Sequence, residues 1–172
     1  FIIGTNINEF PESIGELSQL EKLVCLGAFS VNIPPPEIPS SIVNLQNLKT
    51  FTLRGWTYNK YPRQSWDNQS QNYNDAFEKL SKLPLLVRLT IKDNSLDKIS
   101  GTITKLSNLE YVNLSYNELS DIPDSFSKLT KLKKLVLGQN KFDNSTEEKI
   151  NKLFPNVEID WRAVVTADMD YT

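Results

Sequence analysis

The chain has 172 residues, 39% of them hydrophobic and 23% charged, which is enough apolar material for one continuous core. Its formal net charge of −2 without runs of like charge, and the lack of an apolar stretch of ~20 residues, argue against nucleic-acid binding and membrane insertion. With no histidine and one cysteine, Cys25, the chain lacks the usual general base and the commonest zinc ligand and cannot form an intrachain disulfide. We therefore expect no enzyme activity, no cofactor and no bound metal.

A short alternating segment recurs along the chain. The pattern Leu-x-x-(Leu/Val)-x-Leu-x-x-Asn-x-(Leu/Phe) occurs at 109–119 and at 132–142. In chain order, a truncated unit opens at Phe1, and further units begin at Leu20, Leu48, Leu86, Leu109, Leu132 and Phe154. The starts after the first are 28, 38, 23, 23 and 22 residues apart, so a period of 22 to 23 residues carries two insertions, near 29–37 and 57–75.

The first half of each unit is predicted to be a short strand. Alternation places Val112 and Leu114 in the core and Tyr111 and Asn113 on the opposite face, and stacked units would pair such strands into a parallel sheet. The ninth position of a unit holds Asn6, Asn94, Asn117 or Asn140. We expect the amide of this asparagine to satisfy backbone groups where the chain turns out of the strand.

The second half of each unit predicts a tight helical turn on the other side of the sheet. A proline-containing motif at 10–14, 38–42 and 122–126, and a copy without proline at 99–103, precedes leucines three residues apart. This spacing suits a short 3₁₀ or helical turn whose Ile and Leu side chains close the core.

Two longer helices are predicted. Residues 75–78 look like a helix start before Leu80, and Ser145 to Glu148 forms a capping box before a helix over 149–153. The second helix is expected to belong to a C-terminal cap over about 144–172, which Trp161 finishes.

These repeats resemble the leucine-rich repeats of bacterial surface proteins and of the plant and Ras-scaffold type, over nearly the whole chain. The resemblance implies one α/β domain over 1–172, a curved solenoid with a parallel sheet on its concave side and 3₁₀ or short helical turns on its convex side. It also implies a non-catalytic protein-binding module, bacterial and secreted or at the cell surface, whose partner is a protein or peptide. The first strand begins at Phe1 without a cap, so its open edge is expected to meet upstream repeats, a partner or a flanking segment.

Outward strand positions and the turns beside them are the first candidate binding surface, because such positions line the concave face in the family that the chain resembles. The candidates are Val24, Leu26, Arg54, Arg88, Lys92, Tyr111, Asn113 and Tyr116. They form an apolar end, a basic middle and an aromatic contribution. The alternative stays open that this is an ordinary solvated sheet face whose apolar end is covered by preceding residues.

The second candidate surface is the long insertion after the third strand, which holds Trp56, Tyr58, Tyr61 and Trp66 among polar amides. Rigid aromatics with polar tips are typical of recognition loops for proteins or sugars. Carbohydrate binding is therefore one alternative function, and a structural spacer in a larger surface protein is another. If these rings instead pack on neighbouring repeats, the insertion would be a surface loop without a binding role.

Other reactive side chains do not form a catalytic pattern. Cys25 occupies an inward strand position, which predicts a buried small hydrophobic residue rather than a nucleophile. The carboxylates of Asp67, Asp75 and Glu78 have no second cluster, so we interpret them as surface charges and a helix start rather than an acid/base pair.

Overall fold

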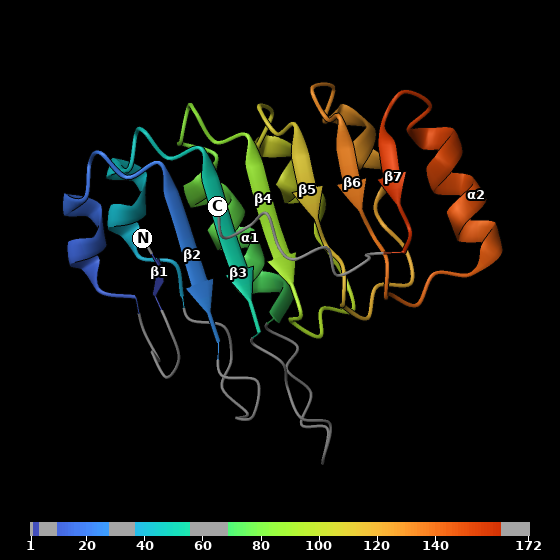
Figure 1. The fold of residues 1–172 in the computed structure, drawn as a ribbon, viewed down its shortest axis with the longest axis horizontal. Coiled ribbons are helices and arrows are strands. Elements are labelled where there is room, and N and C mark those ends of the chain that lie inside the picture. The colour runs from blue at the N-terminus through green and yellow to red at the C-terminus, as the bar shows by residue number, and fades with distance from the viewer. Residues whose placement is uncertain (1, 4–9, 28–36, 56–68, 163–172) are drawn as a thin grey trace, which may run out of the picture.

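The computed structural model describes residues 2–3, 10–27, 37–55 and 69–162, and the account below concerns these residues. Seven short strands form one parallel sheet whose spatial order is the order of the chain, from β1 to β7 (Figure 1). The strands are β1 (Ile2–Ile3), β2 (Lys22–Leu26), β3 (Thr50–Arg54), β4 (Arg88–Lys92), β5 (Tyr111–Asn113), β6 (Lys134–Val136) and β7 (Glu158–Asp160). Because each strand pairs only with the strands of the units before and after it, the chain is a repeat solenoid, as the period predicted.

The helices lie on the other side of this sheet (Figure 1). They are the 3₁₀ helices η1 (Glu12–Glu16), η2 (Ser40–Asn44), η3 (Gly101–Lys105) and η4 (Asp124–Lys128), and the α-helices α1 (Gln69–Leu80) and α2 (Asn144–Leu153). Three of the 3₁₀ helices follow a proline in extended conformation, and η3 follows Ser100, whose hydroxyl accepts from the N–H of Thr102. Proline suits this place because the first N–H groups of a helix have no internal partner. The predicted 3₁₀ turns are confirmed.

Helix α1 begins at Gln69, six residues before the predicted start at Asp75. Tyr73, Phe77 and Leu80 are spaced as one helical face and are all buried. The asparagines on either side of Tyr73, Asn72 and Asn74, have low helix propensity, and they concealed the start of this helix from the sequence analysis. The helix is held by the neighbouring unit, since the Thr102 hydroxyl donates to Asn74 Oδ1 at 2.7 Å.

Helix α2 is capped by Asp143 rather than by the predicted box at Ser145 to Glu148, so that prediction was wrong. One carboxylate oxygen of Asp143 accepts from the N–H of Thr146 at 2.7 Å and from the Ser145 hydroxyl at 2.9 Å. Two cap residues compete within three positions, and the charged one is favoured because it also meets the positive end of the helix dipole.

The core is one continuous cluster between the sheet and the helices. From β2 to β6, inward strand positions are filled by Leu23, Cys25, Phe51, Leu53, Leu89, Ile91, Val112, Leu114, Leu135 and Leu137, all buried. Each large side chain contributes about 1.5–3 kcal/mol by leaving water. No unit closes this layer alone, because the apolar face of each strand is covered partly by its neighbours.

The asparagine ladder exists in the three units where its residues are described. The amide nitrogen of Asn117 donates to the carbonyls of Ile91 at 2.7 Å and Leu114 at 2.9 Å. Its Oδ1 accepts from the N–H groups of Asn94 and Leu96, both at 3.1 Å. Each such asparagine therefore ties two units together, as Asn94 and Asn140 do in turn. The predicted role of this position is confirmed.

Candidate functional site

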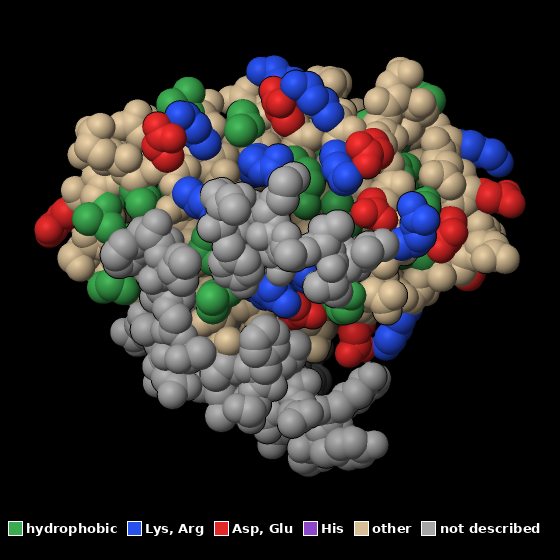
Figure 2. All heavy atoms as spheres, in the orientation of Figure 1, with side chains coloured by type: hydrophobic (Ala, Val, Ile, Leu, Met, Phe, Trp, Pro, Cys, Tyr) green, Lys and Arg blue, Asp and Glu red, His purple; other side chains and the backbone are tan. Residues whose placement is uncertain are grey.

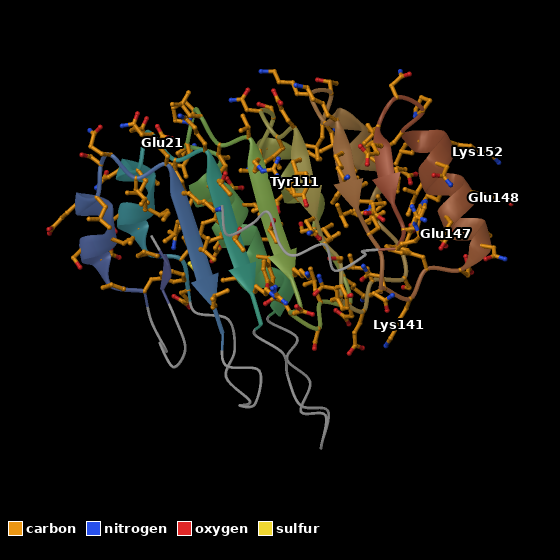
Figure 3. All side chains as sticks on the ribbon, in the orientation of Figure 1. Glu21, Tyr111, Lys141, Glu147, Glu148 and Lys152 are labelled. Carbon is orange, nitrogen blue, oxygen red and sulfur yellow. The ribbon has the colours of Figure 1, made fainter. Side chains whose placement is uncertain are left out.

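The strands pair without an offset, and this register aligns their outward residues in three rows across the sheet. We call Lys22, Thr50, Arg88, Tyr111, Lys134 and Glu158 the amino row, Val24, Thr52, Thr90, Asn113, Val136 and Asp160 the central row, and Leu26, Arg54 and Lys92 the carboxyl row. Tyr111 is seen on the sheet face toward the viewer, whereas Glu148 and Lys152 lie on α2 at the end of the solenoid (Figure 3).

From β2 to β6 the central row is made of small side chains and is buried, whereas Asp160 on β7 is half-buried. The exposed fractions are 2% for Val24, Thr52 and Thr90, 6% for Asn113 and 5% for Val136. The rows on either side carry longer side chains, of which Arg88 is exposed and Arg54 is half-buried. A floor of small residues is therefore flanked by long cationic and aromatic ones.

Charge is distributed unevenly along the face. Strands β2, β3 and β4 carry Lys22, Arg54, Arg88 and Lys92 and contain no aspartate or glutamate, whereas β7 carries Glu158 and Asp160. In Figure 2, Lys and Arg side chains are seen over the middle of this face, and several acidic ones lie toward the end that carries β7, with others at the opposite end and the upper edge. Lys134 Nζ lies 2.6 Å from Glu158 Oε1, and this hydrogen bond raises the pKa of the lysine.

The basic and aromatic candidates meet in pairs, which the sequence analysis did not predict. The guanidinium carbon of Arg88 lies 3.9 Å from the centre of the Tyr111 ring. Lys92 Nζ lies 5.0 Å from the centre of the Tyr116 ring. Such cation–π contacts hold a long cationic side chain in place over the ring.

We call Lys22, Arg54, Arg88 and Lys92 the basic patch. A turn residue that the sequence analysis missed, Asp93, forms an ion pair with one of these cations. Asp93 follows β4, and its Oδ2 lies 3.0 Å from Arg54 Nε. Its φ is 57°, Tyr116 and Gln139 have φ of 55° and 60° at the equivalent places, and Gly55 has φ of 84°. Glycine in one copy of a turn and Asp, Tyr or Gln in the others is the signal that could have revealed this left-handed position.

Asn113 acts within the protein. Its Oδ1 accepts from the N–H of Ser115 at 2.9 Å and from the Ser115 hydroxyl at 2.7 Å. Its Nδ2 donates to the Tyr111 hydroxyl at 3.3 Å. We interpret this candidate as a residue that positions Tyr111 rather than as a partner contact.

The apolar and aromatic candidates have different outcomes. Val24 is buried in the central row and Leu26 is half-buried at the end of β2. The insertion candidates Trp56, Tyr58, Tyr61 and Trp66 lie outside the described residues. The structure thus brings together the basic and tyrosine candidates on β3, β4, β5 and the turn after β5.

The reactive side chains considered in the sequence analysis lie in the core, in an ion pair or outside the described residues. Cys25 is fully buried, as predicted, and burial raises the pKa of its thiol. Glu78 forms an ion pair with Lys105 of the next unit, and Asp67 lies outside the described residues. Across the described ranges there is no group of three or more Cys, Asp or Glu side chains that could hold a metal ion. Within those ranges, no helix is both long and apolar enough to cross a membrane.

Comparison with known proteins identifies the repeat. Residues 84–142 match the family model for the leucine rich repeat. An internalin from Listeria monocytogenes has 15% sequence identity and a TM-score of 0.55, with 90% of this chain and 45% of the internalin chain covered. A Leptospira interrogans leucine-rich-repeat protein has 17% identity and a TM-score of 0.47, covering 89% of this chain and 52% of its own. The chain therefore spans about half the length of these two structures. A search of curated proteins finds no match.

Proposed function

Since this chain is a leucine-rich-repeat protein, we propose that it is a non-catalytic module that binds a protein or peptide through its concave face. Leucine-rich-repeat proteins are commonly interaction modules, and solenoids of this kind use an extended concave surface for binding. The observation that carries the proposal is the alignment of the amino and carboxyl rows, in which Arg54, Arg88, Lys92 and Tyr111 come from neighbouring strands onto one face.

The side chains on this face are of the kind that dominates protein interfaces. Arginine and tyrosine are enriched among the residues that carry most of the binding free energy. Arg88 is already held over the ring of Tyr111, and Tyr111 is held by Asn113. A partner would therefore have less side-chain entropy to remove on binding.

The proposal of a binding module rather than an enzyme rests on the chemistry of the side chains. The sequence has no histidine, and its thiol is buried in the core. Of the carboxylates on this face, Asp93 after β4 is paired with Arg54, and Glu158 on β7 is paired with Lys134. A general base and a nucleophile within hydrogen-bond reach of each other are what acid/base chemistry would need.

We propose that the aromatic insertion, whose candidate residues lie outside the described ranges, is a second recognition surface for the same partner. Carbohydrate binding through Trp56, Tyr58, Tyr61 and Trp66 remains the alternative function, and a spacer role in a larger surface protein remains another. Glycan array binding that is lost in Trp66→Ala would favour the first alternative. Location in a bacterial secreted or cell-surface protein is also part of the proposal and follows from the resemblance of the repeat.

The experiment is selection of peptides from a random displayed library on the full chain. We expect families of peptides whose binding falls at least tenfold in Arg88→Ala and Tyr111→Ala, since truncation of an interface hot spot costs about 2 kcal/mol or more. The matched control is Lys152→Ala, because Lys152 is exposed on α2 away from the sheet face. Selected peptides that bind all three variants equally well would refute binding at the concave face.

A further inference from the structure

We propose that residues 163–172, which follow β7 and lie outside the described ranges, dock on the concave face and compete there with the partner. This proposal rests on the proposed function and adds its regulation, because the same face would hold either the partner or the chain's own C-terminal segment. The side chains of Asp168 and Asp170 are expected to lie over β3 and β4, near Arg54 and Lys92.

The first argument is the burial of Lys92. It stands at an outward position of β4, yet it is only 5% exposed, and the outward residues Thr52 and Thr90 are each 2% exposed. The helices of the described ranges lie on the opposite side of the sheet (Figure 1). The ring of Tyr116 covers one side of the Lys92 ammonium group, and Lys92 has a further interaction besides this contact. A carboxylate is the partner that best offsets the cost of burying an ammonium group.

The second argument is the charge of the segments that could supply this carboxylate. Residues 28–36 have no charged side chain, and residues 56–68 have two cations and one aspartate. Residues 4–9 have one glutamate and are joined at both ends to the first unit. Residues 163–172 have two aspartates and no cation, so this segment is the one whose charge best complements a basic face.

The third argument is reach. An extended chain advances about 3.3 Å per residue, so Asp168 can lie up to about 20 Å from Arg162, and Asp170 up to about 26 Å. In the strand order, β4 is three strands and β3 four strands from β7. At about 4.8 Å per strand, these distances are about 14 and 19 Å. Both aspartates therefore reach the strands that carry Lys92 and Arg54.

The direction of the chain and the spacing of the aspartates agree with this placement. Residue 163 follows the carboxyl end of β7, which is the end of the sheet where the carboxyl row holds Arg54 and Lys92. Side chains two residues apart lie on the same side of an extended segment. Asp168 and Asp170 can therefore face the sheet together.

The test uses the single methionine of the chain, Met169, which lies between the two aspartates. The full chain is labelled with carbon-13 at the methionine methyl group, and NMR measures the chemical shift and transverse relaxation of that one signal. We expect a shift different from that of the free peptide of residues 163–172 and relaxation as slow-tumbling as that of the folded domain.

Three variants locate the contact. Lys92→Gln and Asp168→Asn/Asp170→Asn are expected to move the methyl signal towards that of the free peptide, because each removes charges from the proposed ion pairs. Lys152→Gln is the matched control and should leave the signal unchanged, since Lys152 lies on α2 away from the sheet face. Circular dichroism would verify folding, and the aspartate variant keeps the test valid if Lys92→Gln does not fold.

Competition is measured with peptides selected from the random library. We expect them to bind Asp168→Asn/Asp170→Asn about tenfold more tightly than the unmodified chain, as for a docked form that exceeds the open form by about ten to one. Equal affinity of the two proteins would overturn the competition.

A methyl signal identical to that of the free peptide in the unmodified chain would overturn the docking, as would a docked signal that none of the variants changes. If the methyl signal is free while library peptides depend on Arg88 and Tyr111, the proposed function holds and this inference fails. If the signal is docked and released by the variants, but no library peptide depends on Arg88 or Tyr111 even in Asp168→Asn/Asp170→Asn, the docking holds and the proposed function fails.

Discussion

At the scale of single residues, the asparagine ladder shows how one side chain replaces a missing strand partner. Asn117 donates to and accepts from backbone groups of its own unit and of the unit before it. The Ile91 carbonyl lies in β4 beyond the last residue paired with β5, and the other groups follow β4 or β5, so the asparagine supplies partners where pairing between these two strands has ended. Position nine of the repeat was predictable because its asparagine recurs at a constant place, whereas the contact of Arg88 with Tyr111 was not, since it depends on side-chain rotamers across two strands.

Replacing Asn117 by alanine is expected to lower the free energy of unfolding by about 2–4 kcal/mol, because several buried backbone groups lose their partner. Urea denaturation would measure this change. Asn108→Ala is the matched control, since the Asn108 amide donates to the Pro84 carbonyl and accepts from Lys131 Nζ, and both contacts are exposed. Its loss should cost less than about 1 kcal/mol. Equal losses in the two variants would contradict the role assigned to the ladder.

At the scale of elements, neighbouring units contact each other through their 3₁₀ helices as well as through their strands. The carboxylate of Glu12 in η1 accepts from the N–H groups of Ser40 and Ser41 at 3.1 and 2.9 Å, which lowers the pKa of Glu12. It thereby caps η2, whose own N-terminal residue, Pro39, has no side-chain cap. This contact could not be predicted from periodicity alone, because it depends on the packing of two turns that are separated by an insertion.

The close approach of η1 and η2 requires a glycine at position 15. A Cβ added to Gly15 would lie 2.5 Å from Ser41 Cβ and 2.6 Å from the Ser41 carbonyl oxygen. Gly15→Ala is therefore expected to lower the free energy of unfolding by about 1–3 kcal/mol through overpacking. Gly101→Ala is the control, because its Cβ would meet only the Ser125 side chain, whose Oγ lies at 2.9 Å and can rotate away. Thermal unfolding of both variants would decide, and a Gly15→Ala variant at least as stable as Gly101→Ala would contradict this packing.

The carboxylate of Asp143, which caps helix α2, is expected to make the stability of the protein depend on pH. Hydrogen bonds from the N–H and hydroxyl of Thr146 and from the Ser145 hydroxyl lower the pKa of Asp143 below its ordinary value. The folded state therefore favours the ionised form, so the contribution of the cap is present above the unfolded-state pKa of about 3.9 and is lost as pH falls through the lower folded-state pKa.

Asp143→Asn retains an oxygen that can accept from Thr146 but cannot ionise. We expect the stability of the unmodified chain to fall more steeply than that of Asp143→Asn as pH is lowered from about 5 to 2, because only the unmodified cap becomes protonated. Urea midpoints at each pH would measure the difference. Parallel curves for the two proteins would show that Asp143 does not cap α2.

At the scale of the whole molecule, the repeat period predicted most of the architecture. Seven strands, their inward and outward faces and the 3₁₀ turns follow from a pattern that each unit repeats. The prediction of helix boundaries failed where the period fails: in the polar insertion that α1 begins in, and near the last helix, where Asp143 and Ser145 compete as caps. Residues of the candidate binding surface could likewise be predicted where they follow the repeat period, but their contacts could not. The positions of Arg54, Arg88, Lys92 and Tyr111 came from the repeat, whereas Asp93 as partner of Arg54 required the structure.

The most direct test of the central claim, that the concave face is where a partner binds, is site-specific photocrosslinking. A photoreactive phenylalanine analogue would replace Tyr111 on the sheet face or Leu85 in the turn between α1 and β4, where Leu85 is 44% exposed. With a peptide selected on the unmodified chain, we predict a crosslinked product from position 111 and none from position 85. Crosslinking from position 85 with none from position 111 would place binding away from the sheet face and contradict the account.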